Sequence, residues 1–496
     1  MRFIRLAALA IGYVTLTVIA AAFLAVGLRA LWVAWIYDVP EPEHLSEKEA
    51  YLASLPQVDP AHAPNFVVIF FDDLGYGDLS SYGNALIETP HIDRAAAEGI
   101  RFTEFYSASP VCTPSRASLL TGRYPPRAGV PAHVYFPNDS RLGWLREMAG
   151  LGNELPRDEA LLPEVLGAAG YATGMVGKWH LGGRDGHRPT ERGFDEWLGV
   201  LWSNDMYPLD LWRDDEIAER DERESSGWGE HDEEQPLPGK GIDQSRLTER
   251  YTEAAIDFID RNAEAPFFLY VAHTFPHVPH YPSSAHAGES QGGVYGDVIE
   301  DLDRSTGAIL EALRERDLER ETFVLITSDN GGDYNGSVAG LRGRKQEIFE
   351  GGQRVPAVGW WPGRIKAGRE TRAMAMNIDV FPTLLGYAGL PLPKDRSIDG
   401  ADLGPLLAGE QDSPHEFLFY FPATSMDGLP EAVRDADFKY LRSTGVPMRD
   451  RPHLSDLSRD KEAHDLRKRH PERAEALAQA LEAKRTEFEN DRRGWR

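Results

Sequence analysis

The chain has 496 residues and a formal net charge of −26, with 79 acidic side chains against 53 basic ones. A nucleic-acid-binding protein is normally basic, so this charge disfavours that class, and it would repel a polyanion from most of the surface. With 42% hydrophobic residues the sequence can form a large core, and its length fits one large α/β domain followed by a smaller one.

Residues 1–37 have the composition of a signal-anchor. Arg2 and Arg5 precede an apolar run over 6–28, which is long enough to span a bilayer as a helix. A cleaved signal peptide, which has a shorter apolar region, is the alternative. Both interpretations export the rest of the chain to the periplasm or another extracytoplasmic compartment, and the first also anchors it in the membrane through the N-terminal helix. Residues 38–63 are predicted to be a linker.

Residues 65–71 form a continuous apolar run, which is typical of a buried parallel strand. Asp72 and Asp73 follow this run directly. Adjacent carboxylates repel each other unless a cation lies between them or solvent screens them. A solvated turn is the alternative, but after a buried strand the pair predicts ligands of a hard cation.

The only cysteine, Cys112, lies just before a predicted helix over 114–121. Pro114 suits the first turn of that helix, and Gly122 suits its C-terminal cap. The free N–H groups and the dipole at the start of a helix favour an anion, and Arg116 adds a positive charge one turn in. A buried thiol that acts as a small hydrophobic residue is the alternative, since a lone cysteine cannot form an intrachain disulfide.

Three more apolar strands are predicted over 171–176, 267–271 and 323–328. In open α/β sheets ligands bind at the carboxyl ends of the strands, so polar groups that follow these strands are candidates for one site. Lys178 and His180 alternate and should point to one side of an extended segment. The candidates in chain order are Asp72 and Asp73, Lys178 and His180, His273 and His277, and Asp329 and Asn330.

Shorter strands are predicted beyond residue 415, over 417–421 and 438–441. They predict a small antiparallel sheet. Pro471 opens a final helix that carries Leu477, Leu481 and Phe488 on one face, and this helix is expected to pack on the small sheet.

The run Cys-Thr-Pro-Ser-Arg at 112–116, followed by Ala-Ser-Leu-Leu-Thr-Gly-Arg, resembles the signature of the type I, formylglycine-dependent sulfatases. The likeness is to the branch of arylsulfatase A and N-acetylgalactosamine-6-sulfatase, with a second motif in Gly-Lys-Trp-His-Leu-Gly at 177–182. It implies an alkaline-phosphatase-like α/β fold, in which helices sandwich a mixed, mostly parallel sheet. The implied domains are a catalytic one over 64–414 and a C-terminal subdomain over 415–496, the latter with the small antiparallel sheet and its packed helix.

The resemblance also implies the reaction and the site. A maturation enzyme would oxidise Cys112 to formylglycine, whose hydrate attacks the sulfate ester of a glycan or small aryl substrate beside a Ca²⁺ ion. His273 remains an alternative to His277, and Arg344 a weaker alternative to Lys345. The implied catalytic residues are Cys112, Arg116, Lys178, His180, His277 and Lys345; the substrate-binding residues are Ser203, Lys178, His277 and Lys345; the metal ligands are Asp72, Asp73, Cys112, Asp329 and Asn330.

Three rival functions fit parts of this pattern. A phosphate or phosphonate monoester hydrolase of the same superfamily could use a similar site. A membrane-anchored phosphoethanolamine transferase also has an N-terminal anchor, but it would normally use a threonine nucleophile, zinc and several cysteines. A non-catalytic binder of sulfated glycans would not need the full set of site residues.

Overall fold

The computed structural model describes residues 42–138, 140–148, 152–222, 241–424, 427–443 and 451–496, together with eight residues between 13 and 27. The predicted signal-anchor over 1–37 lies outside the described residues except for those positions. Within the described residues, no helix combines the length and the apolar character needed to cross a bilayer.

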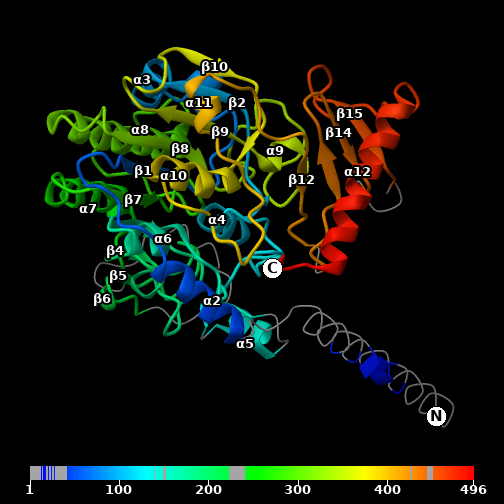
Figure 1. Ribbon diagram of the computed structural model, residues 1–496, viewed down its shortest axis with the longest axis horizontal. Coiled ribbons are helices and arrows are strands. Elements are labelled where there is room, and N and C mark those ends of the chain that lie inside the picture. The colour runs from blue at the N-terminus through cyan, green and yellow to red at the C-terminus, as the bar shows by residue number, and fades with distance from the viewer. Residues whose placement is uncertain are drawn as a thin grey trace, which may run out of the picture.

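Eleven strands of the described chain form one sheet at the centre of the molecule (Figure 1). These strands are β1 (Asn65–Phe71), β2 (Ile100–Tyr106), β3 (Ala172–Lys178), β4 (Glu196–Val200), β5 (Leu211–Arg213), β6 (Glu216–Glu219), β7 (Phe267–Ala272), β8 (Thr322–Ser328), β9 (Arg354–Trp360), β10 (Arg369–Thr371) and β11 (Ala375–Met376). Their order is β10-β2-β9-β8-β1-β7-β3-β4-β5-β6, with β11 also paired to β2. The central strands β8, β1, β7, β3 and β4 are parallel, whereas β9 runs antiparallel to both neighbours. The mixed, mostly parallel sheet predicted from the sequence is confirmed.

Helices cover both faces of this sheet, so that it forms the middle of three layers. The helices of the described chain are α2 (Pro42–Ala53), α3 (Pro90–Glu98), α4 (Cys112–Thr121), α5 (Arg141–Met148), α6 (Leu162–Ala168), α7 (Leu247–Arg261), α8 (Gly293–Glu315), α9 (Glu350–Gln353), α10 (Val380–Ala388), α11 (Gly404–Ala408) and α12 (Pro471–Asn490). Phe66 and Phe70 of β1 pack in the core with α4, α6 and α10. Val67 and Ile69 pack in the opposite core with α3, α7 and α8. Both faces of β1 are therefore apolar, because neither meets water.

A second, antiparallel sheet follows the large one in sequence. Its strands are β12 (Leu418–Tyr420), β13 (Ala432–Arg434), β14 (Phe438–Leu441) and β15 (His453–Asp456). Leu477, Leu481 and Phe488 of α12 are buried in a common core with this sheet, and Figure 1 shows the sheet and helix side by side. The predicted small sheet with a packed C-terminal helix is confirmed.

The segment predicted as a linker contains α2, which the sequence analysis did not predict. Lys48 of α2 is buried and its Nζ lies 2.6 Å from Oε1 of Glu164. The hydroxyl of Tyr51 donates to the carbonyl oxygen of Pro391 at 2.7 Å. This helix has a weak apolar pattern of its own, so its position depends on these contacts with distant segments.

Candidate active site

The acidic residues after β1 and β8 meet because these strands pair in register, with Phe71 opposite Ser328. The backbone N–H of Asp73 donates to Oδ1 of Asp329 at 3.1 Å, and Nδ2 of Asn330 donates to Oδ1 of Asp73 at 2.7 Å. Asp72 follows the same strand as Asp73 and is also fully buried. Four oxygen-bearing side chains, predicted separately from two strand ends, therefore form one buried cluster.

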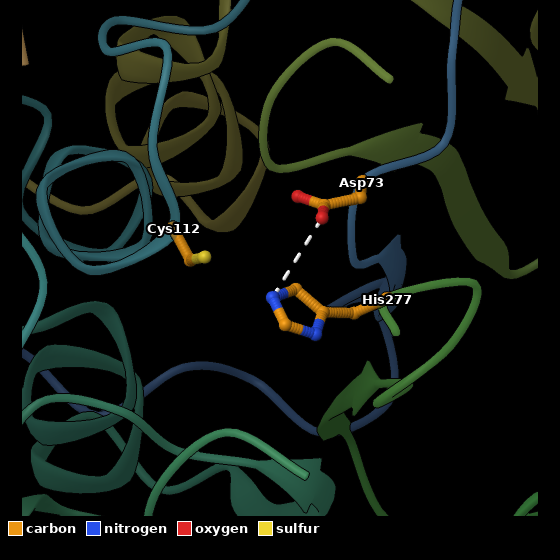
Figure 2. A group of neighbouring side chains, drawn as sticks. All are labelled: Asp73, Cys112 and His277. Carbon is orange, nitrogen blue, oxygen red and sulfur yellow. Dashed lines mark ion pairs between the residues drawn. The ribbon is translucent and has the colours of Figure 1, made fainter. Parts of the chain in front are cut away.

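Cys112 lies against this cluster from the start of α4. It is 2% exposed, and its Sγ lies within 4.8 Å of carboxylate oxygens of both Asp72 and Asp329. Sγ of Cys112, a carboxylate oxygen of Asp73 and a ring nitrogen of His277 also lie within 4.8 Å of one another, and Figure 2 shows these three side chains converging. Burial raises the pKa of the Cys112 thiol to about 12, so the unmodified side chain is neutral at pH 7.

The helix that carries Cys112 begins two residues earlier than predicted, since α4 includes Cys112 itself. Val111 is extended and serves as the N-cap residue, and Gly122 ends the helix with φ of 70°, in the left-handed region that glycine favours. Cys112 is therefore the first residue of the helix, where backbone N–H groups lack partners within the helix.

Two cationic side chains neutralise the buried carboxylates from the side of α4 and β3. Nε and Nη2 of Arg116 donate to Oδ2 of Asp329 at 3.1 and 2.8 Å. Nζ of Lys178 donates to Oδ2 of Asp72 at 2.5 Å and to Oγ of Ser203 at 3.1 Å. Burial opposes ionisation of Asp72, but the charges of Lys178 and its neighbours lower the pKa of Asp72 well below its usual value. Burial and the charge of Asp72 instead raise the pKa of Asp329 to about 7.

Lys345 supplies the third cation, and Arg344 points elsewhere. Nζ of Lys345 donates to Oδ2 of Asp73 at 2.7 Å. Nη1 of Arg344 instead donates to the carbonyl oxygens of Asp333 and Gly336 at 2.7 and 3.0 Å. The structure thus brings Lys345, and not its alternative Arg344, to the acidic cluster.

The two candidate histidines after β7 lie in different environments. Nε2 of His277 is 3.7 Å from Oδ2 of Asp73 (Figure 2). His273 stacks on Phe71 on the face of the sheet that α7 and α8 cover, and its Nε2 lies 3.3 Å from the hydroxyl oxygen of Ser305 on α8. Burial lowers the pKa of His273 to about 3. Only His277 of this pair joins the cluster.

His180 is buried in the site, but not in the conformation expected from the sequence. Strand β3 ends at Lys178, and His180 has φ of 61°, in the left-handed region. The prediction of an extended segment that places Lys178 and His180 on one side is therefore wrong. The ring turns so that Nε2 lies 3.0 Å from the carbonyl oxygen of Tyr135, while Nδ1 has no hydrogen-bond partner among the described residues. Burial, with the charge of Lys178, lowers the pKa of His180 well below its usual value.

Comparison with known proteins places this geometry in a family. The Sulfatase family model matches residues 64–390, about two thirds of the chain. The chain belongs to the sulfatase family. It is 42% identical to human N-acetylgalactosamine-6-sulfatase over 374 residues, which cover 72% of this chain and 68% of the relative. It is 40% identical to human arylsulfatase A over 406 residues, which cover 75% of this chain and 72% of the relative. It is therefore a sulfuric ester hydrolase.

Two further matches extend this assignment. A solved Bacteroides thetaiotaomicron protein, from work on the metabolism of multiple glycosaminoglycans, is 28% identical with a TM-score of 0.74, over 86% of this sulfatase and 100% of that chain. The family model described as the C-terminal part of N-sulphoglucosamine sulphohydrolase matches residues 344–490. This second model covers the small sheet and α12, and it begins inside the segment that carries Lys345.

Asn377 is a residue of this sulfatase to which the sequence analysis gave no role. Its Oδ1 accepts the N–H of Ala108 at 3.0 Å, and its Nδ2 donates to Oγ of Ser115 at 2.8 Å. Asn377 therefore holds both ends of the segment that delivers Cys112. Asn377 begins a buried 3-10 helix over Asn377–Asp379, and the local sequence gives no signal of this role, because its partners lie more than 260 positions away.

The two histidines give a matched test of the site. We expect His277→Ala to lower kcat/KM by about 10²–10⁴-fold, the usual contribution of a proton-transferring side chain, with little change in the unfolding temperature. We expect His273→Ala to leave kcat/KM within a few fold, but to lower the free energy of unfolding by roughly 1–3 kcal/mol, because His273 fills a buried position. Steady-state kinetics and thermal unfolding of both variants decide which of the two histidines belongs to the active site. The reverse pattern would assign the site histidine to His273.

Proposed function

We propose that this sulfatase uses formylglycine derived from Cys112, next to a calcium ion, to hydrolyse sulfate esters of carbohydrate or aryl compounds. The observation that carries the proposal is the position of Cys112: it is the only cysteine, it begins a helix, and its Sγ lies within 4.8 Å of buried carboxylates from two strand ends. The sulfatase family uses a formylglycine and a metal ion, and these residues fit both.

The acidic cluster has the donors that a hard cation requires. Oδ1 of Asp72 and Oδ1 of Asn330 are buried, with no hydrogen-bond partner among the described residues. Uncompensated buried oxygens are costly, and a Ca²⁺ ion held by Asp72, Asp73, Asp329 and Asn330 would satisfy them. Oxygen ligands favour such an ion over zinc. When bound, the ion would supply positive charge that lowers the pKa of a nearby hydroxyl group.

The cations around Cys112 fit the recognition of a sulfate group. Arg116, Lys178 and Lys345 converge from three elements, and the first turn of α4 adds backbone N–H groups. In our proposal they bind the sulfate oxygens and stabilise the negative charge that develops on them. The hydroxyl of Ser203, 3.1 Å from Nζ of Lys178, contributes to the same subsite.

Three residues are suited to move protons. The carboxylate of Asp329 has an oxygen within 4.8 Å of Sγ of Cys112, and it can accept a proton from the nucleophilic hydroxyl. Nδ1 of His277 lies 2.6 Å from the carbonyl oxygen of Val278 and donates to it, so a second proton taken up by this ring would be on Nε2 and could pass to the departing alcohol. Nε2 of His180 likewise donates to Tyr135, which leaves its Nδ1 as a proton acceptor. Hydrated formylglycine has two hydroxyl groups, and His180 would deprotonate the second one.

The substrate and the cellular location are further parts of the proposal. Relatives named N-acetylgalactosamine-6-sulfatase and a neighbour from glycosaminoglycan metabolism favour a sulfated glycan. The apolar run over 6–28 favours export and an N-terminal anchor, with a catalytic domain over 64–414 and a subdomain over 415–496. The partners are then the sulfated substrate, the membrane and a formylglycine-generating maturation enzyme.

The direct experiment is to express the protein with a formylglycine-generating enzyme and to compare its turnover of nitrophenyl sulfate and nitrophenyl phosphate. Mass spectrometry of the peptide around Cys112 reports the oxidation, and sulfated oligosaccharides of defined position then identify the substrate. A preference for the phosphate would support the phosphate or phosphonate hydrolase. An unconverted thiol in the native host, with sulfated glycans bound but not cleaved, would support the non-catalytic binder.

Removal of the metal should abolish most of the activity. We expect treatment with a chelator to lower kcat/KM by at least about 10²-fold, because a bound cation stabilises the charge of the transition state by several kcal/mol in such reactions. Added Ca²⁺ should restore it. Undiminished activity in metal-free protein would contradict the metal site, and recovery with another ion but not with Ca²⁺ would contradict the identity of the metal.

A further inference from the structure

A turn of the C-terminal subdomain, at Lys461 and Glu462, forms hydrogen bonds with the segment that carries Lys345. Nζ of Lys461 donates to the carbonyl oxygen of Ala339 at 2.7 Å, and Oε2 of Glu462 accepts the N–H of Glu350 at 2.7 Å. Between these points, Nη1 of Arg342 donates to the carbonyl oxygen of Glu462 at 3.0 Å. Residues 339–350, called here the lysine loop, are thus held at both ends by two consecutive residues from far along the chain.

Lys439 of β14 completes this attachment from inside the subdomain. Its Nζ donates to the carbonyl oxygen of Ile348 at 2.7 Å, and lies 3.1 Å from Oε1 of Glu350 and 3.2 Å from Oε1 of Glu462. All three charged side chains have no solvent exposure. A buried charge that loses its partner is strongly unfavourable, so these groups hold the end of the lysine loop in one arrangement.

The turn itself is strained, which indicates that its surroundings impose its conformation. Lys461 and Glu462 have φ of 47° and 65°, in the left-handed region, although neither is glycine. Two such residues in succession cost conformational free energy and persist only where contacts over-determine them. The contacts around this turn include those to the lysine loop, together with the bond from the N–H of Glu462 to Oδ1 of Asp460 and the ion pair with Lys439.

The middle of the lysine loop contacts the active site at two points. Nζ of Lys345 donates to Oδ2 of Asp73, and the backbone N–H of Lys345 donates to the carbonyl oxygen of Gly332 at 3.0 Å. The N–H of Gln346 donates to the carbonyl oxygen of Pro110 at 2.8 Å, two residues before Cys112. A shift of the loop would therefore move Lys345 relative to both Asp73 and the nucleophile.

We infer that Glu462, together with Lys439, is a positioning residue for Lys345, so that the C-terminal subdomain sets the geometry of the sulfate site without touching the substrate. This inference rests on the proposed role of Lys345 in binding sulfate. The family model that matches residues 344–490 begins within the lysine loop and extends through the small sheet and α12.

A double-mutant cycle tests this coupling. We expect Glu462→Ala to lower kcat/KM by about 10–100-fold, as for other residues that orient a ligand-binding side chain. In the background of Lys345→Ala, the same substitution should change kcat/KM by less than about twofold, because the residue that it positions is absent. Glu462→Gln keeps an oxygen that can accept the N–H of Glu350, and should retain most of the activity. Binding of inorganic sulfate, measured by calorimetry on the same four proteins, repeats the cycle without depending on turnover.

Controls separate this inference from the proposed function. Asp465→Asn alters an ion pair with Arg467 close to the same turn and should leave kcat/KM unchanged. Arg342→Met removes the bond to the Glu462 carbonyl from the loop side, and provides a second cycle with Lys345→Ala if Glu462→Ala does not fold. Equal losses in the two backgrounds would overturn the inference while the sulfatase activity stands. A folded, matured wild-type protein without sulfatase activity would instead refute the proposed function.

Discussion

Replacement of Cys112 by alanine is expected to reduce kcat by on the order of 10⁶-fold, the loss typical of removing a catalytic nucleophile. Cys112 is buried, and its Sγ lies close to carboxylate oxygens of Asp72, Asp73 and Asp329. Assays with nitrophenyl sulfate measure the loss. Because alanine is a good helix former and the Cys112 thiol has no hydrogen-bond partner among the residues that the structure describes, the unfolding temperature should change by only a few degrees.

Two variants sharpen this result. Ser118→Ala changes a buried side chain of the same helix whose hydroxyl has no hydrogen-bond partner among the described residues, so it should retain full activity. Cys112→Ser supplies one hydroxyl group instead of the two of hydrated formylglycine. It should release at most one alcohol per active site and then stop. Steady turnover by either Cys112 variant would refute the proposed nucleophile.

Replacement of Asp329 by alanine is expected to cost both activity and stability. The carboxylate accepts two hydrogen bonds from Arg116, and both side chains have no solvent exposure. Leaving a buried guanidinium without its partner costs about 3–5 kcal/mol of the free energy of unfolding. The variant also loses a proposed metal ligand and proton acceptor, so kcat/KM should fall by at least about 10³-fold. Denaturant unfolding, kinetics and metal content measure these effects.

The matched control is Asp303→Asn on α8, which changes another buried carboxyl away from the site. Asp303 accepts the backbone N–H groups of His91 and Ile92, and an amide oxygen can keep one of these bonds. We expect some loss of stability, with unchanged kcat/KM and metal content. An Asp329→Ala protein that keeps its metal and its activity would contradict the assignment of Asp329, whatever its stability.

The individual strands and helices could be predicted well from the sequence, and the reasons are local. Residues 65–71 are apolar throughout because both faces of β1 are covered, and that pattern marks a buried parallel strand wherever it occurs. The helix after Cys112 was predicted from Pro114 and Gly122, whose conformational preferences act within one turn. The prediction failed at His180, because a left-handed residue after a strand leaves no trace in the alternation of polar and apolar residues.

The acidic cluster could also be predicted from the sequence. Asp72 and Asp73 follow one strand and Asp329 and Asn330 another, and parallel strands of one sheet present their carboxyl ends at the same edge. The sequence does not show which of two neighbouring candidate residues belongs to the site. His273 and His277 both follow β7, and only the path of the chain after the strand directs one to Asp73 and the other to Ser305.

By itself, the sequence determined the family, the type of sheet, the nucleophile candidate and the carboxylate pairs, because motifs and periodic patterns report local conformation and polarity. The tertiary structure alone decided which charge neutralises which. Arg116 with Asp329, Lys178 with Asp72, and Lys345 with Asp73 are separated by 213, 106 and 272 positions. It also joined Glu462 to the lysine loop. Such pairs form only when strand register and desolvation bring distant groups together, since a buried charge must find a partner and no local pattern specifies which one.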